Sequence, residues 1–324
     1  MAYDISIIVP IYNAQNYIEE CAKTLLEQNF NNIEFVFIDD CSTDNSIKIL
    51  NNVIKKYPTR INDINIIENK KNMGVSYTRK IGMQAAKGEY VIQIDSDDWV
   101  ESNMCEELYL KAKETNADIV ASDYFQNFND RQKYIKQDYG EGINLFRAIL
   151  LSSLHGSLCN KLIKRQLYID FNIYPLEKFN LFEDKFVSLR LFSCTKKISY
   201  IPKAFLHYRQ HESSFTSQHV KSKHIEDTIS FVNAVNDFFK LNNLFDQYQT
   251  EFNSFVLYHK KIFLLDEKFY YLWDDFFPEV NKIKYALNID AYDFKKKLIT
   301  IFTLILGKSI MRVSYSFYRR NRSG

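Results

Sequence analysis

The first 125 residues alternate between short apolar runs and longer stretches of helical periodicity, which narrows the folds open to this chain. Apolar runs at 5–9, 33–38, 64–68, 89–94 and 118–122 have the length of buried strands. Between them, stretches at 17–26, 43–57, 75–86 and 101–114 repeat their apolar residues at helical spacing, and Thr43 or Asp44 can cap the second. This order predicts βαβ units and an α/β fold, with a mainly parallel sheet flanked by helices.

The pattern changes in the second half of the chain. Residues 127–142 are polar and irregular and predict a surface excursion. A helix near 143–151, an apolar segment at 160–163, a helix at 183–194 and a strand at 198–207 are expected next. From about residue 221 the periodicity is helical, without a strand pattern. We therefore expect one domain over residues 1–218 and a helical C-terminal region over 219–324.

Composition excludes several classes of protein. Hydrophobic residues make up 46% of the 324 positions and charged residues 25%, as in an ordinary globular chain. The five cysteines are scattered and never form a C-x-x-C pair, which favours a reduced, cytosolic protein without structural zinc. There is no signal peptide pattern and no apolar stretch of 18 residues. We expect a cytoplasmic protein, and a net charge of +2 gives no reason to expect a nucleic-acid partner.

Polar residues gather where the predicted strands end. Pro10, Tyr12 and Asn13 follow the first strand, Asp39 and Asp40 the second, and a cluster at 95–98 the fourth. Because ligands of α/β sheets bind at the carboxyl ends of the strands, these positions predict a binding site. One acidic strand end can be a helix cap, but three polar strand ends on one edge are hard to assign to capping alone.

The acidic cluster is the sharpest of these features. Asp95, Asp97 and Asp98 place three carboxylates within four residues, which costs repulsion and desolvation unless a cation or ligand compensates. Oxygen ligands suit Mn²⁺ or Mg²⁺, which bridge to diphosphate oxygens. The alternative is a solvated turn before the helix at 101. Since G-x-G-x-x-G and phosphate-loop motifs are absent, a nucleotide would be held by side chains and the metal.

Five motifs occur in an order that resembles family 2 glycosyltransferases, which are inverting enzymes of the GT-A fold. They are IIVPIYN at 7–13, IDDCSTD at 38–44, NMG at 72–74 with Arg79, KGEY at 87–90 and DSDD at 95–98. The resemblance is close over residues 5–125 and looser to about 216. Two positions depart from the family pattern: Cys41 replaces the usual Gly, and Lys80 stands where an Asn is common.

The resemblance implies roles for most of these residues. The first nucleotide-contact loop would consist of Pro10, Tyr12 and Asn13. Asp40 would hydrogen-bond the uracil ring, with Asp39 as the substitute. Asp95 and Ser96 would face the ribose or sugar, with Arg79 near the nucleotide. Asp97 would be the principal metal ligand. Asp98 would contact the acceptor or support the residues that contact the ligands.

A second group of candidates lies further along the chain. Glu183 and Asp184 resemble the family's Glu-Asp motif, in which the Asp is the general base that takes a proton from the acceptor hydroxyl. Glu183 would support the acceptor side. The alternative is a charge interaction at a helix N-terminus.

The segment 208–214 resembles the family's closing segment. It implies that Arg209 and Ser214 contact the diphosphate and that His211 is a metal ligand. His207 competes with it, and either histidine could be structural. Lys161 is similar to a site-facing lysine, with a solvated surface lysine as the alternative.

The C-terminal region carries no catalytic motif. Residues 294–318 mix lysines with apolar residues, as in a helix that lies on a membrane surface, here at the inner face of the cell membrane. A helix packed on the core or on a partner subunit fits the pattern equally well.

These features together predict a metal-dependent inverting glycosyltransferase, transferring a hexose or N-acetylhexosamine. The expected donor is a UDP-sugar, and the expected acceptor is a glycan or lipid-linked oligosaccharide in surface polysaccharide synthesis. Nucleotidyl transfer is weakened by the missing phosphate loop. A non-catalytic glycan-binding or scaffold subunit with the same fold is the alternative from another class.

Overall fold

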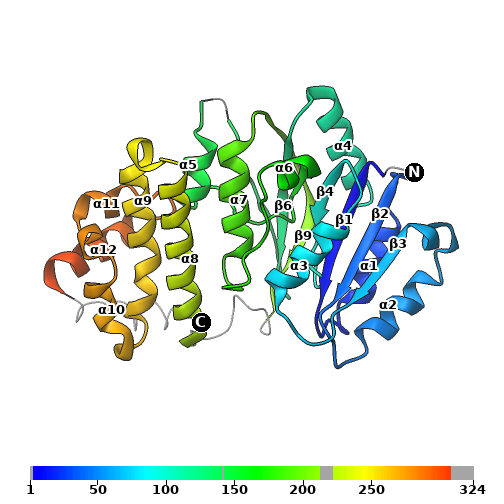
Figure 1. Cartoon of the computed structure of the whole chain (residues 1–324), viewed down its shortest axis with the longest axis horizontal. Helices are drawn as coiled ribbons and strands as arrows, with labels where there is room; N and C mark the ends of the chain where they lie inside the picture. The colour runs from blue at the N-terminus through cyan, green and yellow to red at the C-terminus, as the bar shows by residue number, and fades with distance from the viewer. Residues whose placement is uncertain (1–2, 141, 212–221, 308–324) are drawn as a thin grey trace. The chain divides into compact units, whose positions relative to one another are not determined.

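The computed structural model describes residues 3–140, 142–211 and 222–307 (Figure 1). The chain divides into two compact units, one of residues 1–141 and 156–218, the other of residues 142–155 and 219–324. The first unit is built of strands and helices, and the described part of the second is helical. The α/β expectation is confirmed.

One nine-stranded sheet runs through the first unit in the order β3-β2-β1-β4-β8-β6-β9-β5, with β7 paired to β6. Its strands are β1 (Ile5–Ile11), β2 (Ile33–Asp39), β3 (Ile64–Glu68), β4 (Tyr90–Gln93), β5 (Trp99–Val100), β6 (Ile119–Asn127), β7 (Gln132–Ile135), β8 (Lys161–Lys164) and β9 (Ile198–Arg209). The helices of this unit are α1 (Ile18–Leu26), α2 (Ser46–Ile54), α3 (Val75–Ala85), α4 (Met104–Thr115), α6 (Arg165–Asp170) and α7 (Glu183–Cys194), with a 3₁₀ turn at Pro58–Asp63.

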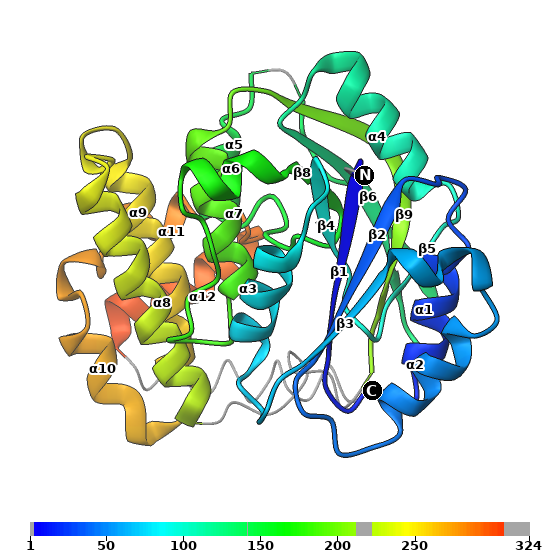
Figure 2. The ribbon, with the colours of Figure 1, turned by 45° about the vertical axis from the view of Figure 1, so that its right-hand side comes forward.

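The strands from β3 to β4 pair in parallel, as the alternating pattern predicts. Both β1 and β2 are buried along their whole length, because helices cover both faces. Alternate residues of β1, such as Ile7 and Val9, pack in the core with α1, α2 and α4. Ile8 faces the other way, toward α3, and α3 lies apart from α1 and α2, across β1 and β2 (Figure 2). There Gly82 lets α3 approach closely, since an added Cβ would lie 2.5 Å from the Ile8 side chain.

Beyond β4 the sheet is mixed, and here the sequence misses short elements. β8 is antiparallel to β4 and β6, while β6 and β9 are parallel. The two-residue strand β5 pairs with β9, and α4 starts at Met104, although the helix was expected from 101. The short helix α6 was not predicted either.

The prediction of an irregular excursion at 127–142 is wrong in part. β6 continues to Asn127 and turns back as β7, an edge strand whose residues are mostly exposed. A kink in the pairing of β6 with β9 falls at Asp123, which is buried. Its carboxylate accepts hydrogen bonds from the Tyr134 hydroxyl (2.5 Å) and the Tyr200 hydroxyl (2.6 Å). This buried acceptor fixes a hairpin whose polar surface residues gave no strand pattern.

The second unit is helical throughout its described residues. Its helices are α5 (Leu145–Leu150), α8 (Ser222–Leu241), α9 (Phe245–Lys260), α10 (Tyr270–Asp275), α11 (Ile283–Leu287) and α12 (Phe294–Leu306), with 3₁₀ turns at Lys261–Leu264, Glu267–Phe269 and Pro278–Val280. Phenylalanines fill its core, among them Phe239 and Phe252, whose ring centroids lie 5.0 Å apart.

Residues 142–155, which the sequence analysis included in the first domain, pack in this helical unit. Arg147 forms ion pairs with Glu251 (3.4 Å) and Asp290 (2.6 Å). The side chain of Asn144 caps α5 and donates to the Tyr248 hydroxyl. No helix within the described ranges is long and apolar enough to cross a membrane.

Candidate active site

The acidic loop follows β4 at the carboxyl end of the parallel strands. Asp98 is buried, and its backbone N–H donates to the Asp95 carbonyl, which forms a turn. One Asp98 oxygen accepts from the Arg209 backbone N–H (2.9 Å), whereas Oδ2 has no hydrogen-bond partner among the residues described. Burial, and then the charges of Asp97 and Asp95, raise the pKa of Asp98 well above its usual value. A buried oxygen without a partner marks this loop as a place where a ligand or cation is expected.

Asp97 and His211 meet beside this loop. His211 Nε2 lies 2.9 Å from Asp97 Oδ2, and the imidazole stacks on the Tyr17 ring with centroids 4.8 Å apart. Burial raises the pKa of Asp97, and the charge of Asp95 adds to this, while His211 lowers it. The structure therefore brings together the two residues that the sequence assigned to a metal.

The donor set of this pair fits a divalent cation. The pair offers an imidazole nitrogen and a carboxylate oxygen, and both are donor types that divalent cations accept. Among residues 3–140, 142–211 and 222–307 no group of three or more such ligands occurs. Two protein ligands suit an ion that takes its other ligands from water and substrate phosphate.

His207 has a different environment. Its Nε2 lies 2.8 Å from Glu101 Oε1, and its ring is stacked against both Trp99 and Phe125 at 4.8 Å. These contacts give it a packing role in the sheet. Of the two candidate histidines, the geometry favours His211 for the metal.

Arg209 is held tightly by the chain itself. Its guanidinium lies over the Trp99 ring, 4.3 Å from the centroid, and forms an ion pair with Glu20. Its Nε donates to the Asp97 carbonyl at 2.9 Å. The sequence did not single out Glu20 or Trp99, since neither stands in a motif. Ser214, the other predicted phosphate contact, lies outside the described residues.

Arg79 connects the acidic loop to the start of α7. Its Nη2 lies 2.5 Å from Asp95 Oδ1, and its Nη1 lies 2.7 Å from Glu183 Oε1. Arg79 is only 4% exposed, so both contacts are made in a low-dielectric setting where ion pairs are strong. Burial raises the pKa of Glu183 to about 8, although Arg79 opposes this shift. The arginine expected near the nucleotide thus ties together two carboxylates that are 88 residues apart.

Asp184 opens α7 next to this bridge. The helix starts abruptly, because Phe182 adopts a left-handed conformation (φ 72°) immediately before it. Asp184 is half-buried, and one of its oxygens accepts from the Lys185 backbone N–H (2.6 Å). Burial raises its pKa, against the lowering effect of Arg79. A carboxylate with a raised pKa is a stronger proton acceptor, which suits a general base.

Lys161 lies at the start of β8 and is fully buried, so the alternative of a surface lysine is wrong. Its Nζ donates to the Ser157 carbonyl (2.6 Å) and to Asn160 Oδ1 (2.8 Å). Burial lowers its pKa to about 8, and the negative charge of Asp184 partly offsets this. The lysine therefore belongs to the electrostatic surroundings of Asp184.

The loops after β1 and β2 are linked to each other. Asn13 has a left-handed backbone (φ 50°), and its Oδ1 accepts from the Thr43 N–H at 2.9 Å. Tyr12 is half exposed, whereas Pro10 lies buried within β1 and Ser96 is partly buried. This linked pair of loops leaves the Tyr12 ring available for contact with a ligand.

Asp39 and Asp40 differ in what they already bind. Asp40 is buried, and its two oxygens accept from the Asn69 side chain and from the backbone N–H groups of Met73 and Gly74, each at 2.8 Å. Asp39 accepts from the Ser42 N–H at 3.0 Å through one oxygen. The geometry therefore favours Asp39 over Asp40 for contact with a ligand.

Cys159 also belongs to the surroundings of the acidic loop. Its Sγ lies 3.6 Å from Asp95 Oδ2, and burial raises the pKa of the thiol well above its usual value. A buried neutral thiol is a weak donor and a poor nucleophile, so its role is packing. In the sequence, only its position next to Asn160 and Lys161 indicates that Cys159 lies near the site.

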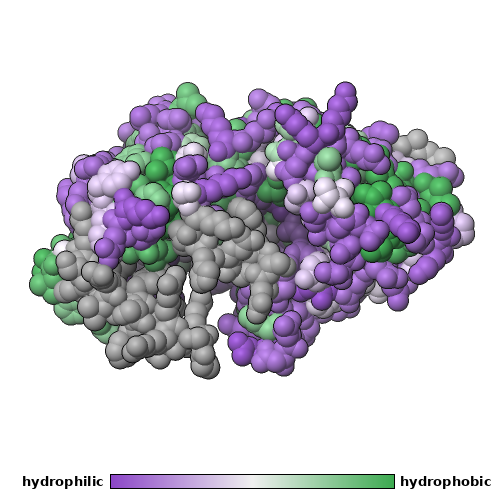
Figure 3. All heavy atoms as spheres, turned by 90° about the horizontal axis from the view of Figure 1, so that it is seen from below, coloured by the Kyte–Doolittle hydropathy of each residue, from purple (hydrophilic) through white to green (hydrophobic). Residues whose placement is uncertain are grey.

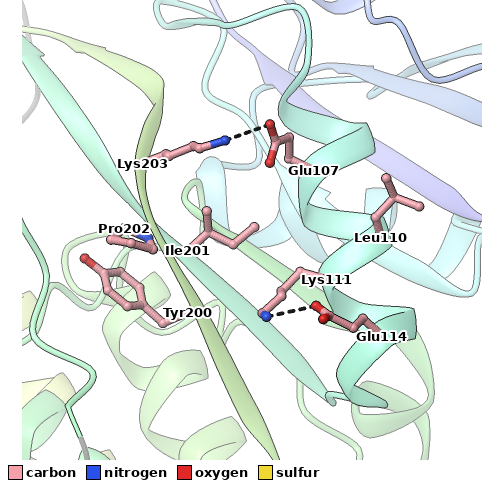
Figure 4. Close-up of a pocket in the computed structure, with 8 residues that line it drawn as sticks. All are labelled: Glu107, Leu110, Lys111, Glu114, Tyr200, Ile201, Pro202 and Lys203. Atoms are coloured by element: carbon pink, nitrogen blue, oxygen red, sulfur yellow. Dashed lines mark hydrogen bonds and ion pairs between the residues drawn. The ribbon is translucent and has the colours of Figure 1, made fainter.

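A separate groove lies between α4 and β9, with a cavity volume of about 490 Å³ (Figure 4). Leu110, Ile201 and Pro202 form its apolar lining. Its lysines are ion-paired, Lys203 with Glu107 and Lys111 with Glu114, both at 2.9 Å. None of the predicted site residues lines this groove, and its charged groups already have partners. We therefore place the candidate active site at the acidic loop.

Comparisons with known proteins identify the family of this chain. The family model described as glycosyl transferase family 2 matches residues 6–171. The putative glycosyltransferase EpsH of Bacillus subtilis is 29% identical over 271 residues, covering 81% of this chain and 77% of EpsH. The cholesterol galactosyltransferase of Borreliella burgdorferi is 30% identical over 332 residues, covering 97% of this chain and 87% of that protein.

A solved structure shares the fold. The crystal structure of S. aureus TarS 1–349 in complex with UDP-GlcNAc superposes with a TM-score of 0.62 at 20% identity, over 98% of this chain and 92% of that one. At this identity the similarity concerns the fold.

Proposed function

We propose a reaction for this chain, which belongs to glycosyl transferase family 2. It transfers a sugar from a UDP-sugar to a glycan or lipid-linked oligosaccharide, with inversion at the anomeric carbon. The chain is a glycosyltransferase, and its α/β unit has the GT-A-like fold. The finer assignment rests on the acidic loop, on the start of α7, and on the UDP-GlcNAc that the similar TarS binds.

One observation carries the proposal: Arg79 ties the acidic loop to the helix that begins with Glu183 and Asp184. Transfer needs one group that holds the donor diphosphate and another that takes the acceptor proton. The Arg79 contacts, at 2.5 Å and 2.7 Å, hold the two elements that carry these groups in one place. Such fixed positioning supplies much of the rate in a displacement between two substrates.

Donor binding falls to the loops at the strand ends. Tyr12, Asn13 and Asp39 would contact the base and ribose, and Asp95 and Ser96 would contact the ribose or sugar. Asp97 and His211 would hold Mn²⁺ or Mg²⁺, which neutralises charge on the departing diphosphate. Arg209 is fixed by Glu20 and the Trp99 ring, and the rest of its guanidinium would contact that diphosphate.

Asp184 is the proposed general base. It accepts the proton of the acceptor hydroxyl as that oxygen forms a bond to the anomeric carbon. The bond from this carbon to the diphosphate breaks on the opposite side, and UDP leaves with the electron pair. An α-linked donor therefore gives a β-linked product. Lys161 and Arg79 stabilise the charged form of Asp184 between turnovers.

The test is Asp184→Asn, which keeps the shape and removes the proton acceptor. Transfer should fall by at least ~10²-fold, the scale of general-base catalysis, while UDP affinity measured by calorimetry stays unchanged. Glu183→Gln is the matched neighbour and should lose less. Suitable donors are found first by screening UDP-sugars for hydrolysis or transfer with Mn²⁺ present.

Two outcomes would contradict the assignment. Near wild-type transfer by Asp184→Asn removes it as the base. An equal loss of UDP affinity makes it a donor ligand instead. If no UDP-sugar turns over and a glycan nevertheless binds, the alternative of a non-catalytic glycan-binding subunit is favoured.

A further inference from the structure

Helix α12 is mostly apolar and yet hardly buried. Eight of its 13 residues are Phe, Leu or Ile, and Thr303 is its one buried residue. By contrast, α9 buries eight of its 16 residues. Asp293 caps α12 with an acceptor for the Lys296 N–H (2.8 Å), so the helix start is well formed. The described part of α12 is therefore not packed as a core helix.

Four of the five exposed large apolar residues of α12 lie close together on one face, and the fifth is Leu306. Phe294, Leu298, Phe302 and Ile305 are 78%, 37%, 50% and 59% exposed. They follow one another at spacings of four, four and three residues, which places them in a stripe along the helix. The surface drawn in Figure 3 is mostly hydrophilic, with hydrophobic side chains in separate patches. A continuous stripe of large apolar side chains on such a protein marks a contact surface.

Basic residues flank this stripe. At 100° per residue, Lys295 and Lys297 fall on opposite sides of the line through Phe294 and Ile305. The charge of the whole C-terminal segment has the same sign, since residues 294–324 contain four lysines, four arginines and no acidic residue. With a net charge of +2 for the chain, the other residues carry −6. The positive charge is thus concentrated, along the sequence, in the segment that begins with α12.

We propose that α12 binds an anionic lipid surface, with its apolar stripe at the boundary of headgroups and acyl chains and the exposed Lys295 at the headgroups. A helix of 13 residues is about 20 Å long, too short for the hydrocarbon core of about 30 Å, so it lies along the surface. An apolar face flanked by lysines is typical of such helices, and each basic residue adds attraction to anionic lipid. This contact is independent of the transferase chemistry.

The experiment is co-sedimentation of the full chain with vesicles, either of phosphatidylcholine alone or with 30% phosphatidylglycerol. We expect binding to the anionic vesicles that weakens as salt rises, since charge attraction is screened. Phe302→Ser/Ile305→Ser removes half of the stripe, and Lys295→Gln removes a flanking charge. The double variant should lose at least ~10-fold in vesicle affinity and the lysine variant about 3- to 5-fold.

The matched control lies in the same unit. Lys240 and Leu241 are exposed on α8, Leu241 at 83%, so Lys240→Gln/Leu241→Ser removes similar groups away from α12. It should bind vesicles like the wild type. Because all these positions are exposed, thermal melts should be unchanged.

Three results would overturn the proposal. These are equal binding to neutral and anionic vesicles, equal loss in the control variant, and no vesicle binding at all. If sedimentation shows a dimer that Phe302→Ser/Ile305→Ser dissociates, the stripe contacts a second copy of the chain instead.

Discussion

Two acidic pairs stand after buried parallel strands of the same sheet, yet their surroundings differ. At the end of β2, the Asp40 oxygens accept from three donors of the chain, two of them backbone N–H groups of the loop before α3. After β4, Asp98 leaves one buried oxygen without a partner among the described residues, and the Asp97 carboxylate contacts the ring of His211. Both oxygens of Asp40 are thus hydrogen-bonded by the chain, whereas Asp98 is repelled by the charges of Asp97 and Asp95.

This difference separates a structural carboxylate from a binding one. A buried carboxylate that accepts several hydrogen bonds stabilises the folded chain. One that is buried beside like charges destabilises it until a cation arrives. The two motifs look alike in sequence. The hydrogen-bond donors around each pair therefore decide whether its carboxylates are structural or bind a ligand.

The largest expected effect comes from Asp97→Asn, which removes charge from the second pair. Transfer should fall by at least ~10²-fold, and UDP affinity should no longer respond to Mn²⁺ or EDTA in calorimetry. Thermal stability in EDTA should be equal or higher, because repulsion within the loop is relieved. Normal turnover, together with equal UDP affinity in both conditions, would refute the metal assignment.

The same substitution in the first pair should act in the opposite sense on stability. The two Asp40 oxygens accept from the backbone N–H groups of Met73 and Gly74, whereas the asparagine of Asp40→Asn has only one acceptor oxygen. Its amide N–H₂ would therefore face a backbone N–H, donor against donor. We expect a loss of about 2 kcal/mol in the free energy of unfolding by urea titration. The dependence of UDP binding on Mn²⁺ should persist. A stability equal to wild type would show that the loop does not depend on this carboxylate.

Glu183 lies between the two cases, since it is buried and also paired with Arg79. Its raised folded-state pKa, about 8, means that the folded chain binds the proton more tightly than the unfolded chain does. Its stabilising contribution is therefore complete below about pH 4.5 and is lost as pH rises toward 8. Relative to Glu183→Gln, the wild type should lose up to about 1.4 kcal/mol of unfolding free energy per pH unit in that window. Parallel pH profiles would place the Glu183 pKa near its ordinary value.

The smallest effect concerns Cys41, which follows the first acidic pair with a left-handed backbone (φ 62°). Glycine adopts this conformation without steric cost, so Cys41→Gly should stabilise the protein by up to about 1 kcal/mol. Asn13→Gly is the control at a similar φ, and it should destabilise because Asn13 Oδ1 accepts from the Thr43 N–H. Thermal melts decide between these signs, and a less stable Cys41→Gly would mean that the thiol contributes packing.

The sequence predicts the parallel part of the sheet well, because β1 and β2 are long, apolar and separated by amphipathic helices. It predicts poorly where tertiary contacts decide. β5 has two residues and depends on pairing with β9, and β7 depends on the hydrogen bonds to Asp123. The site residues follow the same rule. Asp97 and Asp184 stand in motifs. The hydrogen bonds that Asp40 accepts, and the burial of Lys161, depend on residues distant in sequence.

The Arg79 bridge is a further case that sequence could not supply. Glu183 follows Arg79 by 104 positions, and no periodicity connects α3 with α7. Likewise, a preference for His211 over His207 required seeing that Glu101, Trp99 and Phe125 already surround His207. The roles of these side chains remain predictions that the substitutions above can test.

The excursion of residues 142–155 into the helical unit has a practical consequence for dividing this protein. A protein truncated after residue 218 would keep α5 but lose α8 and α9, whose Phe239 and Tyr248 rings pack against Phe146. The missing partners of Arg147, Glu251 and Asp290, would leave its charge unpaired as well. Such a fragment would expose an aggregation-prone apolar segment between β7 and β8. Separate expression of the α/β unit therefore requires removal of residues 142–155 along with the C-terminal helices.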